Sequence, residues 1–484
     1  MDRRRFLKGS GAAVLAGGLA GAHLARSAGE ERADYTLRIG TALVEVGPQR
    51  FLSMTAYNGQ FPGPLLRFKE GRPTVIDIYN DTDTPEQLHW HGQLVPASVD
   101  GAAEERTPDI PAHGMRRERF VPAPAGFRFY HTHVRAGSNL DRGQYGGEVG
   151  PVYIEPARDP GAYDREIFLT LKEFEPYFSQ GGDMAMDFLS PGAADPRLRS
   201  RGESAMRASL ARGMKKGFEV GYRIFTINGR QLGFGEPVRV KRGERILFHI
   251  LNGSATEIRS LALPGHRFNV VALDGNPVPH RAQVPVLWLG TAERVSALVE
   301  MDHPGVWVLG DLDDDDRGNG MGIVVEYAGA GGKPVWSAPP PLRWDYRRFA
   351  APMHEPTAPD ETIDFLIDKD NAAEHGFNRW TLNGTAFDYT AMPVSRRLAR
   401  GRRYRLHLRN ATDDIHPIHV HRTRFELTRI AGLPTAGLLK DVVMLGGYQS
   451  MDLDFTADQA GLVLFHCHSQ LHMDYGFMSL FETA

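Results

Sequence analysis

The chain repeats one stretch of sequence three times, and this repetition limits its fold more than any other feature. The copies read YNGQFPGPLLRFKEGRPTVIDIYND from Tyr57, INGRQLGFGEPVRVKRGERILFHILNG from Ile227 and LNGTAFDYTAMPVSRRLARGRRYRLHLRNA from Leu382. Each copy carries an Asn-Gly turn signal near its start. A glycine and an asparagine lie nine residues apart in every copy; these are Gly71 and Asn80, Gly243 and Asn252, and Gly401 and Asn410. Such self-similarity indicates a series of related structural units.

Residues within each repeat alternate as they do in β-strands. Stretches such as VIDIY (75–79) and YRLHL (404–408) are typical of half-buried strands. A second repeated piece follows in each unit, reading GFRFYHTH from Gly126, GVWVLGDL from Gly305 and GLVLFHCH from Gly461. We therefore predict an all-β chain of three consecutive Greek-key β-sandwich domains over 34–157, 158–330 and 356–484, with a Gly/Pro-rich linker over 331–355.

Composition excludes several other classes of protein. With one cysteine in 484 residues, the chain can form neither an internal disulfide framework nor a four-thiolate zinc site. Its net charge of −3 gives no electrostatic reason to expect nucleic acid binding.

The first residues resemble a twin-arginine export signal, because the arginines of MDRRRFLK precede a short stretch rich in Gly and Ala. This stretch is too short and too rich in small residues to span a membrane, and no other segment looks transmembrane. We expect a signal peptide over 1–28 and a mature protein in the periplasm or outside the cell. The alternative is a basic tail on a cytosolic protein.

Histidines occupy matching places in the first and third repeats. Counted from the strand-ending asparagine, positions nine and eleven form a His-x-His pair, and positions five and seven after the later glycine form another. These pairs are His89 and His91, His131 and His133, His419 and His421, and His466 and His468. The middle repeat has Leu261, Leu263, Gly310 and Leu312 at the equivalent positions.

Strand geometry gives these pairs a chemical meaning. Residues i and i+2 project from the same face of a strand, so each His-x-His presents two imidazoles together. If the first and third domains pack face to face, eight imidazoles meet at one interface. Eight are too many for a single metal ion and suit a cluster of about three ions with open positions for a ligand.

The only cysteine, Cys467, lies between His466 and His468, so its side chain points to the opposite face of the strand. There it can meet His416 and His472. One thiolate and two imidazoles form the ligand set of a blue-copper electron-transfer site. Zinc accepts the same ligands, but it gives no reason to connect this site to a histidine cluster. The peptide bonds on either side of Cys467 would join the two sites by a short electron path.

Four motifs together resemble the copper motifs of three-domain multicopper oxidases, the laccase-like group: HWHG (89–92), HTH (131–133), HPIHVH (416–421) and HCHSQLHMDYGFM (466–478). The resemblance spans the mature chain and implies three cupredoxin domains and four copper ions. It implies one-electron oxidation of a small-molecule reducing substrate, coupled to reduction of O2 to water. Carried over by position, it assigns His416, Cys467 and His472 to type 1 copper, His89 and His419 to type 2, and His91, His131, His133, His421, His466 and His468 to the type 3 pair.

The chain departs from the family pattern in two places. The axial position of type 1 copper falls on Phe477, a residue that cannot coordinate and should therefore raise the copper potential; a shift of one residue would place Met478 there instead. Some members have a glutamate after the last histidine as a proton source, whereas this chain has Met473 followed by Asp474. We expect Asp100, which matches a family aspartate beside the cluster, to deliver protons; the alternative is a solvated turn residue.

The motifs leave the electron donor open. The leading hypothesis is a laccase-type oxidase of phenols and aromatic amines. The alternative is a metallo-oxidase of Cu(I), Fe(II) or Mn(II) in metal tolerance, although the 15 methionines are scattered. GGDMAMDF (181–188) comes nearest to a methionine-rich insertion, and DLDDDDRGNG (311–320) is an acidic stretch that a metal substrate could use. A copper-free scaffold is disfavoured because all eleven ligand positions are filled. Oligomeric state is not predicted.

Overall fold

Strands predominate in the computed structural model, which describes residues 31–157, 163–180, 188–190, 194–213, 216–351 and 354–484. The predicted signal peptide, 1–28, lies outside the described residues, as does nearly all of the methionine-containing stretch 181–188. Residues Ala33–Ala484 form one compact unit.

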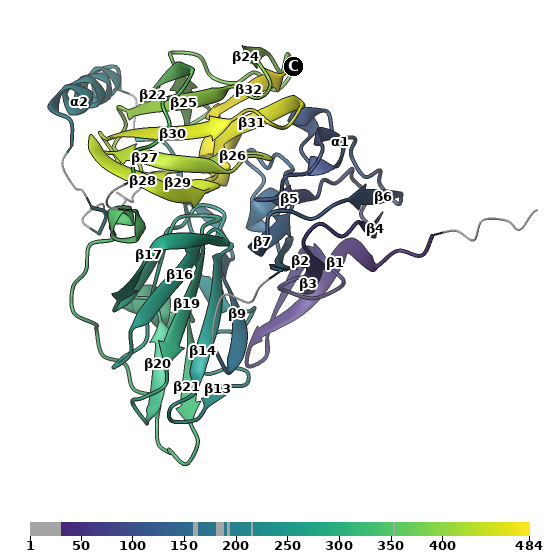
Figure 1. Cartoon of the computed structure of the whole chain (residues 1–484), viewed down its shortest axis with the longest axis vertical. Coiled ribbons are helices and arrows are strands. Elements are labelled where there is room, and N and C mark those ends of the chain that lie inside the picture. Colours follow the sequence, from purple (N-terminus) through teal and green to yellow (C-terminus); the bar gives the residue numbers. More distant parts are fainter. Residues whose placement is uncertain (1–30, 158–162, 181–187, 191–193, 214–215, 352–353) are drawn as a thin grey trace, which may run out of the picture. The chain divides into compact units, whose positions relative to one another are not determined.

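The first sandwich consists of two four-stranded sheets, in the orders β2-β1-β4-β6 and β3-β8-β7-β5 (Figure 1). Short helical turns, α1 (Ala97–Asp100), η1 (Ala103–Glu105) and η2 (Gly143–Tyr145), lie in its loops. Its strands are β1 (Tyr35–Gly47), β2 (Arg50–Tyr57), β3 (Leu66–Lys69), β4 (Thr74–Asn80), β5 (His89–His91), β6 (Met115–Phe120), β7 (Gly126–His131) and β8 (Val149–Glu155).

The second sandwich has a six-stranded sheet, β12-β9-β14-β19-β16-β17, and a five-stranded sheet, β13-β21-β20-β15-β18. A separate two-stranded sheet, β10-β11, and the helices α2 and α3 accompany it. Its elements are β9 (Arg165–Phe174), β10 (Tyr177–Ser179), α2 (Pro196–Ala211), β11 (Glu219–Gly221), β12 (Ile224–Ile227), β13 (Val238–Val240), β14 (Arg245–Asn252), β15 (Arg259–Ala262), β16 (Phe268–Leu273), β17 (Asn276–Val284), β18 (Val286–Leu289), β19 (Arg294–Glu300), β20 (Val306–Gly310), α3 (Asp314–Gly318) and β21 (Gly322–Tyr327).

The third sandwich repeats the second strand for strand, in the orders β23-β22-β25-β30-β27-β28 and β24-β32-β31-β26-β29. The first sandwich follows the same plan without the equivalents of β16, β17 and β18. The elements of the third are β22 (Glu361–Glu374), β23 (Phe377–Leu382), β24 (Val394–Leu398), β25 (Arg403–Asn410), β26 (His416–Val420), β27 (Phe425–Ile430), β28 (Leu433–Lys440), β29 (Val442–Leu445), β30 (Ser450–Thr456), β31 (Gly461–Cys467), α4 (Gln470–Asp474) and β32 (Met478–Thr483).

The repeated asparagines explain why the loops before the histidine strands have one shape. Asn410 is buried, and its side-chain Nδ2 donates to the carbonyls of Asp414 (2.8 Å) and Gly446 (3.1 Å), while its Oδ1 accepts from the backbone of Thr412 at 2.9 Å. Asn80 and Asn252 make the equivalent three hydrogen bonds in their own domains. A buried amide with its partners satisfied fixes the start of the loop that follows the strand, and it does so in all three sandwiches.

The Asn-Gly turns also have a common role. Asn58, Asn228 and Asn383 each have φ between 52° and 53°, in the left-handed region, and the glycine that follows each has a positive φ too. Two successive residues of this kind form the turn that best suits a hairpin. The repeats therefore mark the same hairpin three times.

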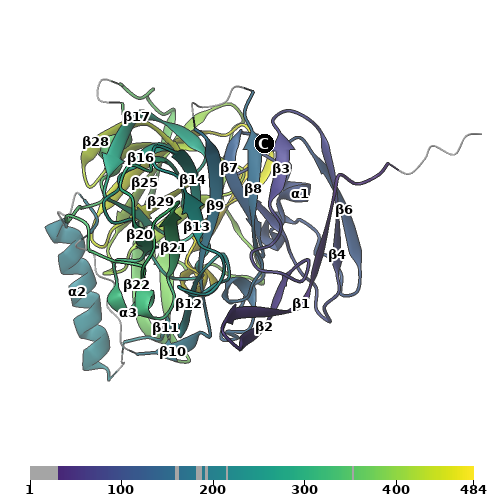
Figure 2. The ribbon, with the colours of Figure 1, turned by 90° about the horizontal axis from the view of Figure 1, so that it is seen from below.

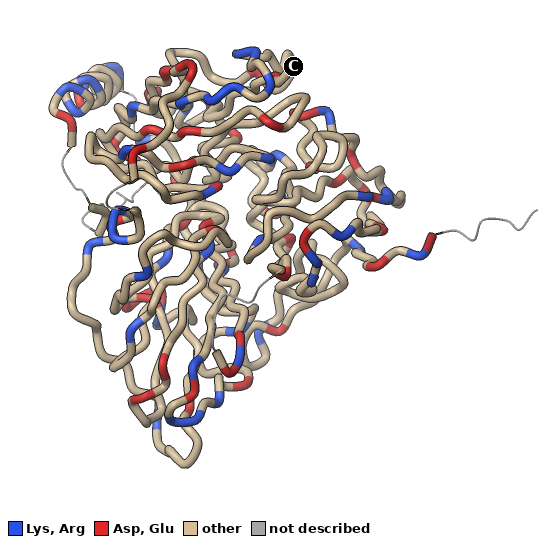
Figure 3. The backbone as a smooth tube through the Cα atoms, in the orientation of Figure 1, with Lys and Arg blue, Asp and Glu red and all other residues tan. Residues whose placement is uncertain are grey.

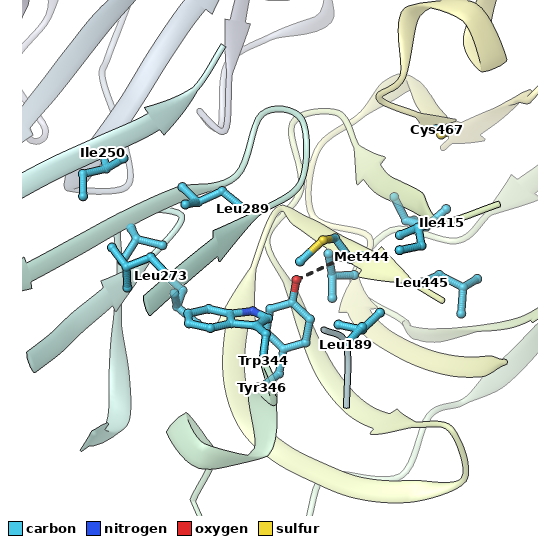
Figure 4. Packing of buried hydrophobic residues seen from close by; sticks show 14 of the residues in the cluster. Leu189, Ile250, Leu273, Leu289, Trp344, Tyr346, Ile415, Met444, Leu445 and Cys467 are labelled. Carbon is cyan, nitrogen blue, oxygen red and sulfur yellow. Dashed lines mark hydrogen bonds between the residues drawn. The ribbon is translucent and has the colours of Figure 1, made fainter. Parts of the chain in front are cut away.

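One apolar core runs through the second and third sandwiches (Figure 4). The segment between them, predicted as a linker, contributes the buried side chains of Trp344, Tyr346 and Phe349, the last two within the 3₁₀ turn η3 (Tyr346–Phe349). The hydroxyl of Tyr346 accepts a hydrogen bond from the backbone of Met444, 3.2 Å away, in the third sandwich. This part of the segment therefore belongs to the core, and the exact domain boundaries stay a prediction.

Helix α2 belongs to the middle repeat but lies beside β22 of the third sandwich (Figures 1 and 2). Asp195 caps its N-terminus and Pro196 occupies the first turn, both of which favour helix initiation. Arg201 of α2 forms two hydrogen bonds of 2.8 Å with Asp368 on β22. Figure 3 shows basic residues along this helix. In the part of the chain that the structure describes, no helix is both long and apolar enough to cross a membrane.

Candidate metal centre

Four strands of the first and third domains carry the first histidine of each predicted pair; the second lies within the strand only in β5, whereas His133, His421 and His468 follow the ends of β7 (Gly126–His131), β26 (His416–Val420) and β31 (Gly461–Cys467). Strand β5 consists of His89, Trp90 and His91. Strand β7 ends at His131, which lies opposite His89 in the antiparallel register. In the third domain His419 on β26 lies opposite His466 on β31. Residues opposite one another share a sheet face, so each domain presents its two pairs side by side.

The first pair of each domain meets the first pair of the other. The rings of His89 and His421 stack with centroids 4.0 Å apart, and those of His91 and His419 stack at 3.9 Å. Since these residues come from domains separated by more than 300 positions, the contact shows that the first and third sandwiches touch at their histidines.

The second pairs lie equally close. Ring centroids are 5.3 Å apart for His133 and His466, and 5.1 Å apart for His131 and His468. All eight cluster histidines are at most 2% exposed. The structure thus brings together every residue that the sequence analysis placed in the cluster.

Ring nitrogens without a protein partner indicate what this cluster can bind. Among the described residues, the buried nitrogens without a hydrogen bond include Nε2 of His89, His131 and His419, Nδ1 of His91 and His468, and both nitrogens of His133. Leaving such atoms unpaired costs free energy. Three histidine sets have donor atoms within 4.8 Å of one another: His89, His419 and His421; His89, His91 and His131; and His133, His421 and His466. The donor set therefore fits metal ions.

Burial also keeps these imidazoles in the form that binds metal. Desolvation is the largest cause that lowers the pKa well below its usual value, and neighbouring histidines lower it further. This holds for His91, His131, His419, His421, His466 and His468. Neutral rings at neutral pH keep a lone pair available.

Cys467 lies on the other face of β31, inside the third domain, as the alternation of the strand requires (Figure 4 labels it above Ile415). Its Sγ is 3.6 Å from Nδ1 of His416 and 3.4 Å from Nδ1 of His472, and these nitrogens are 3.0 Å apart. Burial raises the pKa of the thiol and lowers the pKa of His472 to about 4. A buried thiol of this kind becomes a thiolate only when a cation binds it.

The structure separates the two candidates for the axial position. The ring of Phe477 lies against that of His416, with centroids 4.8 Å apart, and belongs to the same buried cluster as Cys467. The side chain of Met478 instead packs among Ala102, Leu462, Leu464, Met473 and Leu480.

Asp100, predicted as a proton carrier, is fully buried beside the cluster. Its Oδ2 lies 2.8 Å from Nδ1 of His421 and 3.1 Å from Nδ1 of His89, and its carbonyl lies 2.9 Å from the latter. One side chain thus orients a histidine from each outer domain, which excludes a solvated turn residue.

Sequence reasoning missed three further carboxylates beside the cluster. On η1, Glu104 lies 3.5 Å from Nδ1 of His133, and Glu105 accepts from Arg422 (2.8 Å) and from the backbone of Leu464 (2.7 Å). Asp441 lies 3.2 Å from His91. Glu104 and Glu105 follow Asp100 closely in the sequence, which is a weak indication that they lie near the cluster. No sequence pattern indicated Asp441.

A small cavity opens beside the cysteine site. Nε2 of His416 lies 2.9 Å from the hydroxyl of Thr412, which lines a cavity of about 180 Å³ between α2 and the third domain. Its lining includes Glu203, Met206, Asp368, Lys369, Asp413 and Tyr448. The cavity reaches Thr412, whose hydroxyl contacts a proposed ligand of the cysteine site.

Asp414 also bears on this site, because its Oδ2 accepts from Nε1 of Trp380 at 3.2 Å. The ring of Trp380 in turn lies over that of His472, with centroids 4.1 Å apart. Ion pairing with Lys369, whose Nζ is 2.9 Å away, lowers the pKa of Asp414 despite its burial. The anion and the indole together fix the orientation of one ring of the site.

Comparison with known proteins agrees with this geometry. Three sequence models described as "Multicopper oxidase" match residues 42–159, 202–328 and 356–484. The chain is 29% identical over 476 residues to "Multicopper oxidase MmcO" of Mycobacterium tuberculosis (strain ATCC 25618 / H37Rv), covering 96% of this chain and 90% of that protein. It is 28% identical over 331 residues to "Copper resistance protein A" of Pseudomonas syringae pv. tomato, covering 62% of this chain but only 52% of that protein.

A multi-copper oxidase from Pseudomonas Thermotolerans has a similar crystal structure, with a TM-score of 0.68 and 24% identity over 94% of this chain and 100% of that one. That likeness supports the three cupredoxin-like sandwiches. The three matched segments, the fold and the convergent histidines lead to one conclusion: this chain belongs to the multicopper oxidase family.

Proposed function

We propose that the protein is a laccase-type oxidase, which takes electrons singly from small phenols and aromatic amines and delivers them to O2. The observation that carries this proposal is the geometry of β31, where Cys467 faces one site and His466 and His468 face another. Family membership supports copper and oxidase chemistry. The donor class and the roles of individual residues are our proposal.

Four copper ions fit the donor atoms described above. His416, Cys467 and His472 would hold the type 1 ion. His89 and His419 would hold the type 2 ion, and the remaining six cluster histidines, namely His91, His131, His133, His421, His466 and His468, would hold the type 3 pair. Copper bound in these sites supplies reversible one-electron chemistry and, at the cluster, a place where O2 takes up four electrons and four protons to give two waters.

The protein's own residues prepare these sites. Phe477 covers the cysteine site with a ring that offers no ligand atom, which favours a high potential. Asp100 holds His89 and His421 by their Nδ1 atoms, leaving the opposite nitrogens for the cluster. As a buried carboxylate next to the site of O2 reduction, Asp100 can also pass protons from its Oδ1, which has no hydrogen-bond partner among the described residues.

We propose that the donor enters through the cavity lined by Thr412 and α2. A donor there would contact Thr412, whose hydroxyl lies 2.9 Å from Nε2 of His416; Nδ1 of the same ring faces Cys467. A cavity of about 180 Å³ accommodates a single aromatic ring and not a bulky donor. The ring of Tyr448 and the aliphatic part of the lining would contact such a molecule.

The same cavity favours a second candidate, oxidation of metal ions. It offers the thioether of Met206 and the carboxylates of Glu203, Asp368 and Asp413, which are ligand types for cuprous and ferrous ions. All three carboxylates already have a cationic partner: Asp368 pairs with Arg201, Asp413 with Lys369, and Glu203 with Arg207. That pairing lowers their availability, so we rank metal oxidation second.

The acidic stretch 311–320 is a weaker place for a metal substrate. Asp313 caps α3, Asp311 accepts from Ser260, and Asp316 pairs with Arg259. These contacts give the carboxylates structural roles.

We further propose export by the twin-arginine route to the periplasm or beyond, which the N-terminal sequence supports.

The test is to measure steady-state kinetics of the copper-loaded enzyme on a phenol, Cu(I), Fe(II) and Mn(II) side by side, with copper per chain measured on the same sample. We expect close to four copper ions and the highest kcat/KM for the phenol. A metal ion as the better donor would favour the second candidate, and a chain without copper would contradict both.

A further inference from the structure

The carboxylate of Asp441 lies where all three domains meet. It belongs to the third domain, immediately before β29, and is almost completely buried. Two buried arginines reach it: Arg128 from β7 of the first domain and Arg294 from the start of β19 in the middle domain. The middle domain, which has no histidine pair, thus contributes a charged group to the surroundings of the cluster.

Arg294 holds the carboxylate by both oxygens. Its Nη1 and Nη2 donate to Oδ1 and Oδ2 of Asp441 at 2.6 Å each, while Nη1 of Arg128 donates to Oδ2 at 3.0 Å. A two-pronged guanidinium contact fixes the plane of a carboxylate, which a single contact does not do. The orientation of Asp441 therefore depends mainly on Arg294.

Arg294 itself has little freedom. Its Nη1 donates to the carbonyl of Ala292 at 3.0 Å, its Nη2 donates to that of Asp274 at 3.2 Å, and its guanidinium lies over the ring of Phe129. Gly92, the last residue of the HWHG motif, lies against the pair: a Cβ there would be 2.5 Å from Oδ2 of Asp441. The packing leaves the pair only one arrangement.

Asp441 in turn contacts a histidine from each outer domain. Its Oδ1 is 3.2 Å from Nε2 of His91, and its carbonyl is 2.7 Å from Nδ1 of His419. His91 is thereby oriented opposite to three of its neighbours, although His468 also leaves Nδ1 unpartnered. It presents Nδ1 as the unpartnered nitrogen, whereas His89, His131 and His419 present Nε2.

We propose that Arg294 is a positioning residue for the histidine cluster: by fixing Asp441, it determines which nitrogen of His91 faces the metal. A carboxylate held by two guanidinium groups accepts a proton-bearing nitrogen, so Nε2 of His91 donates and Nδ1 keeps its lone pair. This inference rests on the copper ligands proposed above. It gives the middle domain, which contributes no histidine to the cluster, a role in orienting one of the cluster's ligands.

The test is Arg294→Met, a change that removes the guanidinium and keeps a long apolar side chain. We expect the blue absorption of the cysteine site to remain, because that site lies wholly within the third domain. We expect the near-ultraviolet absorption of the coupled copper pair to be lost and cluster copper to bind about 10–100-fold more weakly. Copper titration with both spectra is the measurement. Wild-type affinity in this variant would overturn the proposal.

Arg259→Met is the matched control. Arg259 is an equally buried arginine of the middle domain, paired with Glu173 at 3.2 Å and with Asp316. This control should lower the melting temperature while all four copper ions stay bound. If it loses the same cluster copper as Arg294→Met, the effect is general destabilisation and the proposal is wrong.

Arg294→Lys decides the matter if the methionine variant does not fold. A lysine can reach one oxygen of Asp441 but cannot fix its plane, so we expect cluster affinity between that of the wild type and the predicted loss. Unchanged affinity would overturn the proposal. If the wild-type chain itself binds no copper, the proposed function fails and this inference with it; if the wild type binds four and the variants do too, only this inference fails.

Discussion

The middle and third domains share one strand order yet differ completely in what they can bind. Strands β15 and β26 occupy the same place in their sheets, but the repeat puts Leu261 and Leu263 in one domain where the other has His419 and His421. Both leucines are buried in the apolar core. The comparison teaches that the sandwich supplies positions, and that the residues at a few of these positions decide whether a domain binds metal.

The middle domain nevertheless influences the sites of its neighbours. It contributes α2 to the cavity beside His416 and, by our inference, Arg294 to the surroundings of His91. On this proposal, the outer domains hold the ligands and the middle domain shapes access and orientation. The following experiments test this division.

Replacing Cys467 with Ser should remove one site completely and leave the other. Because Cys467 is the only sulfur ligand of its type in the chain, we expect the blue absorption and the oxidase activity to disappear. Visible spectroscopy, copper content and O2 uptake are the measurements. Blue colour in this variant would contradict the assignment of the type 1 site.

Asp100→Asn tests the contact between the outer domains. The amide keeps the size of the side chain but weakens its hold on Nδ1 of His421 and His89. We expect O2 reduction to slow about 10–100-fold, as for other partners of ligating histidines. Reduction of the cysteine site by a phenol under anaerobic conditions should keep its wild-type rate. A slowing of that step would show that Asp100 acts elsewhere.

Acid should destabilise the copper-free protein, mainly through its outer domains. Burial lowers the pKa of His472 to about 4, and it lowers the pKa of others, such as His91 and His419, well below the usual value. These rings stay neutral when folded but take up protons on unfolding below pH ~6.5. Stability is therefore complete above that pH and falls as pH drops, by about 1.4 kcal/mol per pH unit for each such histidine.

The measurement is urea unfolding at several pH values with and without copper. Copper-bound rings cannot take up protons, so the loaded protein should show a shallower pH dependence. In the middle domain His249, whose pKa burial lowers to about 3, should contribute the slope of a single histidine in both states. Equal slopes with and without copper would contradict the proposed ligands.

Replacing Leu261 and Leu263 together with His tests whether ligands alone make a site. No histidine pair of another domain is expected to face them, so we predict no additional copper. Each buried ring without partners should destabilise the fold by about 1–3 kcal/mol. Copper content and urea unfolding would check both. Extra bound copper would show that the middle domain needs only ligands to become a metal site.

Phe477→Met should have the smallest structural effect. The two side chains are similar in volume, so we expect the fold to be retained. A thioether beside His416 and Cys467 can act as a weak axial ligand and should lower the potential of the type 1 copper. Redox titration of the blue absorption measures this. An unchanged potential would favour Met478 as the axial residue.

The sequence predicted the cluster well because strand periodicity is local. Pairs spaced by two residues must share a face, and the repeats placed four such pairs in equivalent strands. The side of β31 on which Cys467 lies followed from the same rule. The prediction needed only one assumption about tertiary structure, namely that the outer domains meet.

Contacts that depend on packing between domains could not be predicted in this way. Asp441, Arg294 and Glu105 are single charged residues without a spacing pattern, and they become neighbours of the histidines only when three sandwiches are assembled. For helix α2, Asp195 and Pro196 are local signals of its start. Its position against β22 depends on contacts such as that with Asp368, which no local pattern reveals.

The absence of a side chain at Gly92 limits which domains could be exchanged between related proteins. A chimaera that took its first domain from one relative and its last from another would have to match backbone and side chain at this joint, because any larger residue at 92 would collide with the acid and the guanidinium opposite. The last residue of the HWHG motif would then decide which domains can be exchanged. Exchange of a whole domain would depend on the absence of a Cβ atom at position 92.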